Sequence, residues 1–271
     1  MKINIKDWVK HRKEDINEEL GGVYLSQLPT LLILQMGDDP ASNSYIKGKM
    51  KDAEECGIQA SLFKTNSAAS LKRFVAANAK YYDGIILQEP CELTEEDKKI
   101  ILSYILNEQD VDGFLPNSKH QPCTPKGIMK IIDEFYEPDN PYKPNLHGKT
   151  VAVIGRGELV GKPLIPMLVE KGATTISCNS KTRDLATFTK EADIVITAVG
   201  KEKLITRDML KDGAFVVDAG ITFDELGKLC GDCDKVLYDD NDIRVTPVPG
   251  GVGLTTRLAL MENVVDAAQM K

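Results

Sequence analysis

The chain has 271 residues, enough for one large or two ordinary domains. Hydrophobic residues make up 42% and charged residues 28%, a globular balance that excludes a largely disordered or low-complexity chain. Lys and Arg total 34 while Asp and Glu total 41, and the resulting net charge of −7 argues against binding to a nucleic-acid backbone.

Apolar runs are short throughout. The longest, residues 31–34, has the length of a strand and falls far below the ~20 residues of a membrane span. Residues 1–7 lack the apolar core of a secretory signal, so we expect a reduced, cytoplasmic protein whose six cysteines are free thiols. Cys230 and Cys233 have a motif spacing, but no second ligand pair follows, which predicts two loop thiols and no metal site.

The first half of the chain alternates short apolar runs with longer amphipathic ones. Thr94 is placed to cap one helix, and Thr124 followed by Pro125 is placed to open another. The pattern predicts strands at 31–35, 60–63 and 85–88, and helices at 7–20, 42–56, 69–81 and 94–106. The polar, Pro-rich stretch 137–145 that follows is typical of a linker.

The alternation restarts beyond this stretch. It predicts strands at 150–154, 174–178, 193–198 and 215–218, and helices at 159–170 and 256–269. Strand–helix alternation over the whole length predicts an α/β fold with parallel sheets.

A glycine-rich turn lies between the strand at 150–154 and the helix that follows it. Gly155, Gly157 and Gly161 have the spacing G-x-G-x-x-x-G, one residue longer than the usual dinucleotide fingerprint. Such a turn lets a pyrophosphate approach the N-terminus of the helix. A plain strand-to-helix turn is the alternative.

The end of the next strand indicates which dinucleotide would bind. An NAD site usually has an acid about 20 residues on, for the ribose 2′-hydroxyl. Residues 177–183 contain no acid here, and Ser180 lies among basic residues that Arg156 can join. This set suits a 2′-phosphate and predicts NADP. A solvated polar loop is the alternative.

Small residues end the following two strands. Thr197 and Gly200 close the strand at 193–198, and Gly220 precedes Ile221 after the strand at 215–218. Strand ends with small side chains let a ribose or a ring pack against the backbone. We therefore include Thr197, Gly200 and Ile221 among the cofactor contacts.

Candidate catalytic groups lie in the first half. Tyr45 and Lys49 are spaced i, i+4 and share one helix face, although such a pair is also common on solvent-facing helices. Gln88 ends a predicted parallel strand, where ligands bind in such sheets. Asp112, in the turn 110–114, carries a carboxylate that can accept hydrogen bonds from the amines of a heterocycle.

Further along, the loop 247–253 combines prolines with glycines. Gly250 and Gly251 can bring backbone groups against a ligand.

Five motifs in this order resemble the bifunctional methylenetetrahydrofolate dehydrogenase/methenyltetrahydrofolate cyclohydrolase family. The resemblance runs from about residue 29 to 265. The motifs are 38–42 with Tyr45 and Lys49, then 110–114, 122–127, 155–163 and 246–253.

The resemblance implies oxidation of the methylene bridge of methylenetetrahydrofolate by NADP, with NAD also used in the family, and then hydrolysis to 10-formyltetrahydrofolate. It implies that Lys49 handles the water and its proton, that Gln88 holds the lysine, and that Tyr45 stacks on the folate. Asp112 matches the family's aspartate that binds the amine edge of the pterin ring. The resemblance also implies a role in one-carbon metabolism and purine biosynthesis.

For the cofactor, the resemblance implies 2′-phosphate contacts from Arg156 and Ser180, and a folate–nicotinamide loop containing Gly250 and Gly251. It implies a folate-binding α/β domain at 1–121, to which helix 251–271 returns, and a Rossmann-like domain at 122–250. A cleft between the two domains and a homodimer are also implied, with no nucleic-acid or membrane partner.

Several positions depart from the family pattern. Residues 89–92 read Glu-Pro-Cys-Glu where the family has Leu-Pro-Leu-Pro, and we expect Glu89 to weaken folate binding by repelling the glutamate tail. Residues 115–121 form a shortened loop, Gly157 replaces a serine, and 254–256 read Leu-Thr-Thr.

Two other function classes stay open. One is a different two-domain NAD(P)-dependent dehydrogenase, acting on a shikimate- or amino-acid-like substrate. The other is a nucleotide-binding regulator without catalysis. The presence of both Lys49 and Gln88 argues against each of them.

Overall fold

The chain divides into two compact units. The computed structural model describes residues 2–22, 24, 27–139 and 145–270, so the middle of the expected linker lies outside the described residues. The N-terminal unit comprises Lys10–Cys123 and Arg257–Lys271, and the C-terminal unit comprises Met1–Val9 and Thr124–Thr256. The division falls inside α1 (Ile5–Leu20) and α8 (Val252–Gln269), so each of these helices contributes to both units.

A parallel three-stranded sheet forms the centre of the N-terminal unit. Its order is β2 (Gln59–Thr65), β1 (Thr30–Met36), β3 (Gly84–Leu87). The middle strand is a continuous apolar run in which residues 31–34 are fully buried, as expected for a strand covered on both faces. Ile33 of β1 is in register with Leu62 and Ile86 of its neighbours.

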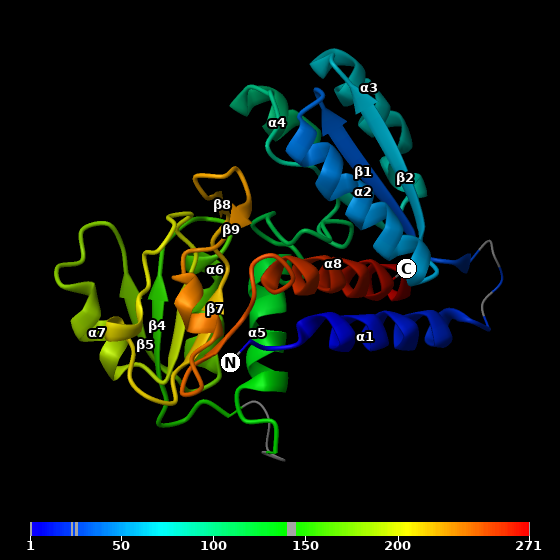
Figure 1. Cartoon of the computed structure of the whole chain (residues 1–271). Helices are drawn as coiled ribbons and strands as arrows, with labels where there is room; N and C mark the ends of the chain where they lie inside the picture. The colour runs from blue at the N-terminus through cyan, green and yellow to red at the C-terminus, as the bar shows by residue number, and fades with distance from the viewer. Residues whose placement is uncertain (1, 23, 25–26, 140–144, 271) are drawn as a thin grey trace. The chain divides into compact units, whose positions relative to one another are not determined.

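Helices α2 (Pro40–Glu55), α3 (Ala68–Asn78) and α4 (Glu95–Leu102) connect and flank these strands (Figure 1). Asp39 caps α2 by accepting from the backbone N–H of Ser42 at 2.7 Å. Thr94 caps α4 through the N–H of Asp97 at 3.1 Å, as predicted. The predicted extension of this helix to residue 106 is wrong, because the helix ends at Leu102 and the N–H groups of Tyr104 and Ile105 bond three residues back in tight turns.

The C-terminal unit contains a five-stranded parallel sheet. Its order is β10 (Arg244–Val245), β7 (Phe215–Asp218), β6 (Ile194–Thr197), β4 (Thr150–Ile154), β5 (Thr174–Cys178). Strands β6 and β7 are buried throughout. The unit also contains α5 (Cys123–Phe135) from its second residue on, α6 (Gly161–Glu170), α7 (Leu185–Glu191) and the short hairpin β8 (Thr222–Phe223) with β9 (Leu229–Cys230).

The α/β class with parallel sheets is confirmed, while several element boundaries differ from prediction. Helix α5 begins at Cys123, so Thr124 lies in the first turn and is not its cap. Helix α8 begins at Val252, four residues before the predicted start, and in its first turn the hydroxyls of Thr255 and Thr256 both donate to the Val252 carbonyl, at 3.0 and 2.9 Å. The short elements α7 and β10 were not predicted.

The two spaced cysteines lie inside the C-terminal unit. Cys230 and Cys233 are each 4% exposed, and burial raises the pKa of both thiols. Among the described residues, no cluster of His, Cys, Asp and Glu could hold a metal ion. Across the same residues, no helix is both long and apolar enough to cross a bilayer.

Candidate active site

A buried lysine and a glutamine pair inside the N-terminal unit. Helix α2 carries Lys49 and the end of β3 carries Gln88; the two side chains are 8% and 7% exposed. The Lys49 ammonium donates to Gln88 Oε1 at 3.0 Å. The Gln88 amide nitrogen donates to the carbonyl of Glu89, which turns the amide oxygen toward the lysine. The backbone N–H of Gln88 extends the β1–β3 pairing by donating to Leu34 O at 2.9 Å.

The turn 110–114 places a third polar group near this pair. Asp110 bridges to Ile85 of β3, and its carboxylate accepts from the Leu115 N–H at 2.7 Å, so Asp110 holds the turn. Asp112 is the carboxylate in electrostatic range of Lys49. Burial raises the pKa of the Asp112 carboxyl, and the positive charge of Lys49 opposes this shift.

Two residues that sequence reasoning did not select support this turn. The Asn263 amide of α8 donates to the carbonyls of Val111 and Gln121, at 2.9 and 3.1 Å. The Cys123 thiol donates to the Val111 carbonyl at 3.2 Å and lies close enough to the Asp112 carboxyl to influence it. A buried Asn on an apolar helix is the one signal that could have indicated such a role.

Tyr45 lies one turn before Lys49 on α2 and is 37% exposed. Burial raises the pKa of its hydroxyl, and the positive charge of Arg257 opposes the shift. Tyr45 therefore presents a partly open ring on the helix face that buries Lys49.

Glu89 is paired in the structure. Its carboxylate forms an ion pair with Lys98 of α4 and accepts from the Cys91 N–H at 2.9 Å. The hydrogen bond to Glu89 is the main cause that raises the pKa of Lys98. The ion pair with Lys98 offsets locally the charge that is expected to repel the glutamate tail, and the effect of Glu89 on folate binding stays a prediction.

The glycine turn between β4 and α6 is packed too closely for side chains at two positions. Gly155 has φ +108°, and a Cβ there would lie 2.5 Å from the Ala198 carbonyl oxygen of the β6 end. A Cβ on Gly161 would lie 1.9 Å from the Gly155 carbonyl oxygen. A Cβ on Gly157 would meet nothing within 4 Å, so the surroundings of this residue are open. The turn thus places glycine backbone, without side chains, at the start of α6.

Arg156 reaches from this turn to the end of β5. Its Nε donates to Ser177 Oγ at 2.9 Å and its Nη2 to the Ser177 carbonyl at 2.8 Å. Ser180 follows in an exposed turn, and Arg156 is itself exposed. Ser177 was not predicted as part of the site, since only the folded sheet shows which strand end the arginine meets.

Thr197 has a different environment from the one predicted. Its side chain is fully buried, and its hydroxyl donates to Asp232 Oδ2 at 2.6 Å. Asp232 also accepts from the N–H groups of Val199 and Lys201, at 2.8 and 2.7 Å. We therefore assign Thr197 to supporting the loop after β6 and not to contacting a ligand directly.

The other predicted contacts in the C-terminal unit lie in loops. Gly200 has φ +77° in the loop held by Asp232, and Ile221 is 53% exposed. Gly250 has φ +101°, and a Cβ on Gly251 would lie 2.3 Å from the Pro247 carbonyl oxygen, so this loop requires both glycines.

One unit of the chain is a parallel α/β unit with a buried Lys–Gln pair, and the other is built on a dinucleotide-type glycine turn. This combination defines the class as a two-domain nucleotide-binding protein. Residues 3–112 match the family model described as tetrahydrofolate dehydrogenase/cyclohydrolase, catalytic domain, and residues 122–271 match the model of its NAD(P)-binding domain. The chain belongs to the tetrahydrofolate dehydrogenase/cyclohydrolase family.

Individual relatives agree with this assignment. Bifunctional protein FolD of Campylobacter jejuni is 39% identical over 88% of this chain and 87% of its own length, and that of Streptococcus thermophilus is 37% identical over 89% and 87%. The crystal structure of the Campylobacter jejuni enzyme superposes with a TM-score of 0.87 at 34% identity, covering 98% of each chain. The Trypanosoma brucei enzyme, complexed with NADP cofactor and inhibitor, has a TM-score of 0.87 at 27% identity, covering 100% of this chain and 97% of its own.

Proposed function

We propose that this enzyme oxidises 5,10-methylenetetrahydrofolate to 5,10-methenyltetrahydrofolate with NADP, and then hydrolyses the product to 10-formyltetrahydrofolate. The buried contact between Lys49 and Gln88 carries the proposal. It lies in the unit that matches the family's catalytic domain, with the Asp112 carboxylate in electrostatic range of the lysine.

Substrate binding uses groups of the same unit. Asp112 accepts hydrogen bonds from the amine edge of the pterin, and Tyr45 stacks on the folate through its partly exposed ring. The half-buried setting of Asp112 strengthens hydrogen bonds to its ionised form, because little water competes for the carboxylate. Gly250 and Gly251 line the folate and nicotinamide region with backbone, as the resemblance implies.

The residues around the glycine turn fit NADP. Gly155 and Gly161 let the turn pack against Ala198 and against its own backbone, while the surroundings of Gly157 are open, which suits the approach of a pyrophosphate to the start of α6. Arg156, fixed against Ser177, and exposed Ser180 suit a 2′-phosphate, and the end of β5 presents no acid to repel one. Bound NADP supplies the hydride acceptor, and Gly200 and Ile221 lie in the loops that follow β6 and β7.

Hydrolysis depends on Lys49. The oxidised substrate is a cation, so a water molecule adds to its one-carbon unit, the ring opens and one proton is released. Lys49 positions this water and manages the proton, while Gln88 holds the lysine by one hydrogen bond and leaves its other donors available.

One assay tests the proposal. The protein is incubated with tetrahydrofolate, formaldehyde and NADP, and the absorbance of methenyltetrahydrofolate is followed, with loss of that absorbance reporting hydrolysis. NADP binding measured by calorimetry without any methenyl product would favour a regulator and overturn the proposal.

We also propose the finer features that the family resemblance implies. The enzyme works as a homodimer in a reduced cytoplasm, which six free cysteines support, and its 10-formyl product serves purine biosynthesis. The folate domain is proposed as residues 1–121 with helix 251–271, and the nucleotide domain as residues 122–250. These bounds differ from the two compact units in that Met1–Val9 and residues 251–256 group with the C-terminal unit.

A further inference from the structure

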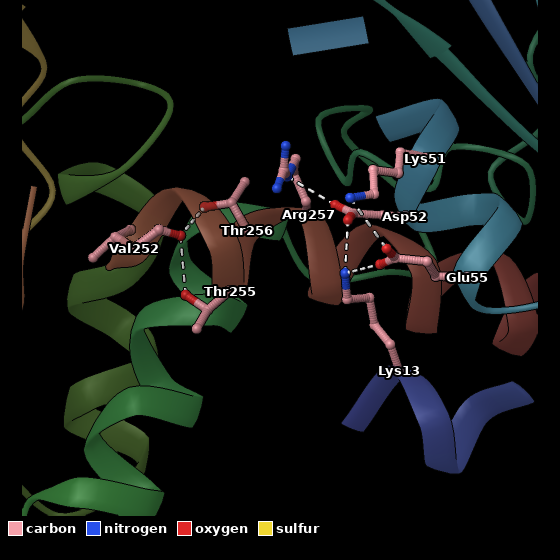
Figure 2. A network of polar contacts seen from close by, with 8 residues as sticks. All are labelled: Lys13, Lys51, Asp52, Glu55, Val252, Thr255, Thr256 and Arg257. Atoms are coloured by element: carbon pink, nitrogen blue, oxygen red, sulfur yellow. Dashed lines mark hydrogen bonds and ion pairs between the residues drawn. The ribbon is translucent and has the colours of Figure 1, made fainter. Parts of the chain in front are cut away.

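An arginine at the start of α8 lies across the catalytic face of α2. Arg257 Nε lies 2.8 Å from Asp52 Oδ2 (Figure 2). A Cβ on Gly48 would lie 1.9 Å from Arg257 Nη1 and 3.0 Å from its Cζ. The guanidinium therefore occupies space that exists only because residue 48 has no side chain.

The helix period places this arginine beside the proposed folate-binding groups. Tyr45, Gly48 and Lys49 are spaced i, i+3 and i+4, so they share one face of α2. Asp52, at i+7, continues that face by one turn. The positive charge of Arg257 acts on the Tyr45 hydroxyl, where it opposes the rise in pKa that burial causes. Arg257 thus reaches from Asp52 across Gly48 toward the tyrosine.

Neighbouring charges hold the arginine in place but do not use its whole donor set. Asp52 is 6% exposed and is held on its other oxygen by Lys13 of α1 at 2.8 Å. Glu55 pairs with Lys13 and with Lys51 (Figure 2). Lys13 thus bridges the two carboxylates, Lys51 also pairs with Glu55, and Asp52 is shared between Lys13 and Arg257.

Arg257 has donors left for an external anion. Among the described residues, its two terminal nitrogens have no acceptor, and its side chain remains 22% exposed. The planar guanidinium fork matches a carboxylate, and the ion pair with Asp52 together with the close packing over Gly48 restricts its position before a ligand arrives.

We propose that Arg257 binds a carboxylate of the substrate's glutamate tail and so selects pteroylglutamates over the same ring system without glutamate. The inference rests on the proposed function, because the tail belongs to that substrate. Asp52 and Gly48 act as positioning residues, the first by holding Nε and the second by leaving room for Nη1.

The test compares two substrates on the whole enzyme. Methenyltetrahydrofolate carries one glutamate, and methenyltetrahydropteroate carries none. The wild type should have the lower KM for the glutamate form. Arg257→Met should raise that KM about tenfold, the loss of one charge-assisted contact, and should leave the KM for the pteroate form and both kcat values within about twofold.

Two further variants separate binding from folding. Lys47→Met removes an exposed cation from the same helix and should leave the substrate preference unchanged. Gly48→Ala keeps the arginine but displaces it, and should reproduce the loss of preference. Alanine is favoured over glycine inside a helix, so α2 itself should not weaken.

Equal effects of Arg257→Met on both substrates, or a wild type that shows no preference, would overturn the inference. Calorimetric titration with tetrahydrofolate and tetrahydropteroate repeats the comparison without turnover. A wild type that binds both ligands but converts neither methenyl compound would contradict the proposed function alone. A wild type whose affinities for the two ligands are equal would contradict the role of Arg257.

Discussion

The Lys49 ammonium donates to the Gln88 amide oxygen at 3.0 Å, and the contact joins residues 39 positions apart in the chain. The amide takes one of three ammonium donors and adds no charge of its own. A carboxylate in its place would form a tight ion pair. The neutral partner instead holds the side chain in a buried setting while leaving donors for water.

Replacing the lysine tests the hydrolytic step. Lys49→Met should reduce hydrolysis of methenyltetrahydrofolate by ~10²–10⁴-fold, because a positioned acid–base group is removed. NADP affinity, measured by calorimetry, should stay near that of the wild type, since the glycine turn belongs to the other unit. Lys47→Met is the matched control on the same helix. More than half of the wild-type rate in Lys49→Met would refute the assignment.

Cofactor choice should depend on Arg156. The wild type should prefer NADP over NAD roughly tenfold to a hundredfold in kcat/KM, as expected for charge-assisted hydrogen bonds to a phosphate. Arg156→Ala should lose most of this preference. Ser177→Ala should lose part of it, because Ser177 Oγ accepts from Arg156 Nε at 2.9 Å. An unchanged preference in Arg156→Ala would mean that the 2′-phosphate is bound elsewhere.

The ion pair between Glu89 and Lys98 predicts an asymmetry between two variants. Lys98→Met leaves the Glu89 carboxylate uncompensated and should weaken binding of an anionic folate about twofold to fivefold, a modest repulsion screened by solvent. Glu89→Gln leaves the Lys98 cation uncompensated and should strengthen the same binding by a similar factor. The double variant should bind like the wild type. Calorimetry at low and high salt measures all three, and an equal loss in both single variants would contradict this reasoning.

Folate binding should weaken in mild acid because of Asp112. Burial raises the pKa of this carboxyl above the ordinary aspartate value of 3.8, so it protonates at a higher pH than an exposed aspartate. The protonated group is a poorer acceptor for the pterin amines, and affinity should fall as the pH drops through the raised pKa. The Asp112→Asn variant should bind folate weakly at neutral pH, and its affinity should not fall further as the pH drops. A wild-type affinity that stays constant down to the ordinary aspartate range would contradict the role.

Lys13 should stabilise the fold in a pH-dependent way. Lys13→Met should lower the free energy of unfolding by about 2 kcal/mol at neutral pH, because Asp52 is buried and loses one of two partners. The hydrogen bond from Lys13 lowers the pKa of Glu55 below its usual value of 4.5. That part of the stabilisation is present above the unfolded pKa and is lost as pH falls through the lowered folded value.

Urea denaturation of both proteins at neutral and acidic pH checks this prediction, and the difference between them should shrink in acid. Lys10→Met is the control, because the pair of Lys10 with Glu14 is largely exposed and should contribute less than ~1 kcal/mol. A difference that grows on acidification would contradict the assignment of Glu55.

The sequence alone determined the features that repeat locally along the chain. Six of the predicted strands, those at β1, β3, β4, β5, β6 and β7, have bounds within one residue, and all of these except β5 are continuous apolar runs that the fold buries. The i, i+4 spacing determined that Tyr45 and Lys49 share a face, and glycine spacing located the turn after β4. Each of these depends on the backbone period or on one residue's own conformational freedom.

Only the tertiary structure decided which distant partner each polar group has. The sequence does not show that Arg156 meets Ser177, that Glu89 meets Lys98, or that the Thr197 hydroxyl is taken by Asp232. Nor does it show that Gly48 leaves room for Arg257, 209 positions further along the chain. Such pairs have no periodic signature, because they arise where packed strands and helices bring remote segments together, and burial then selects the partner that satisfies each charge and donor.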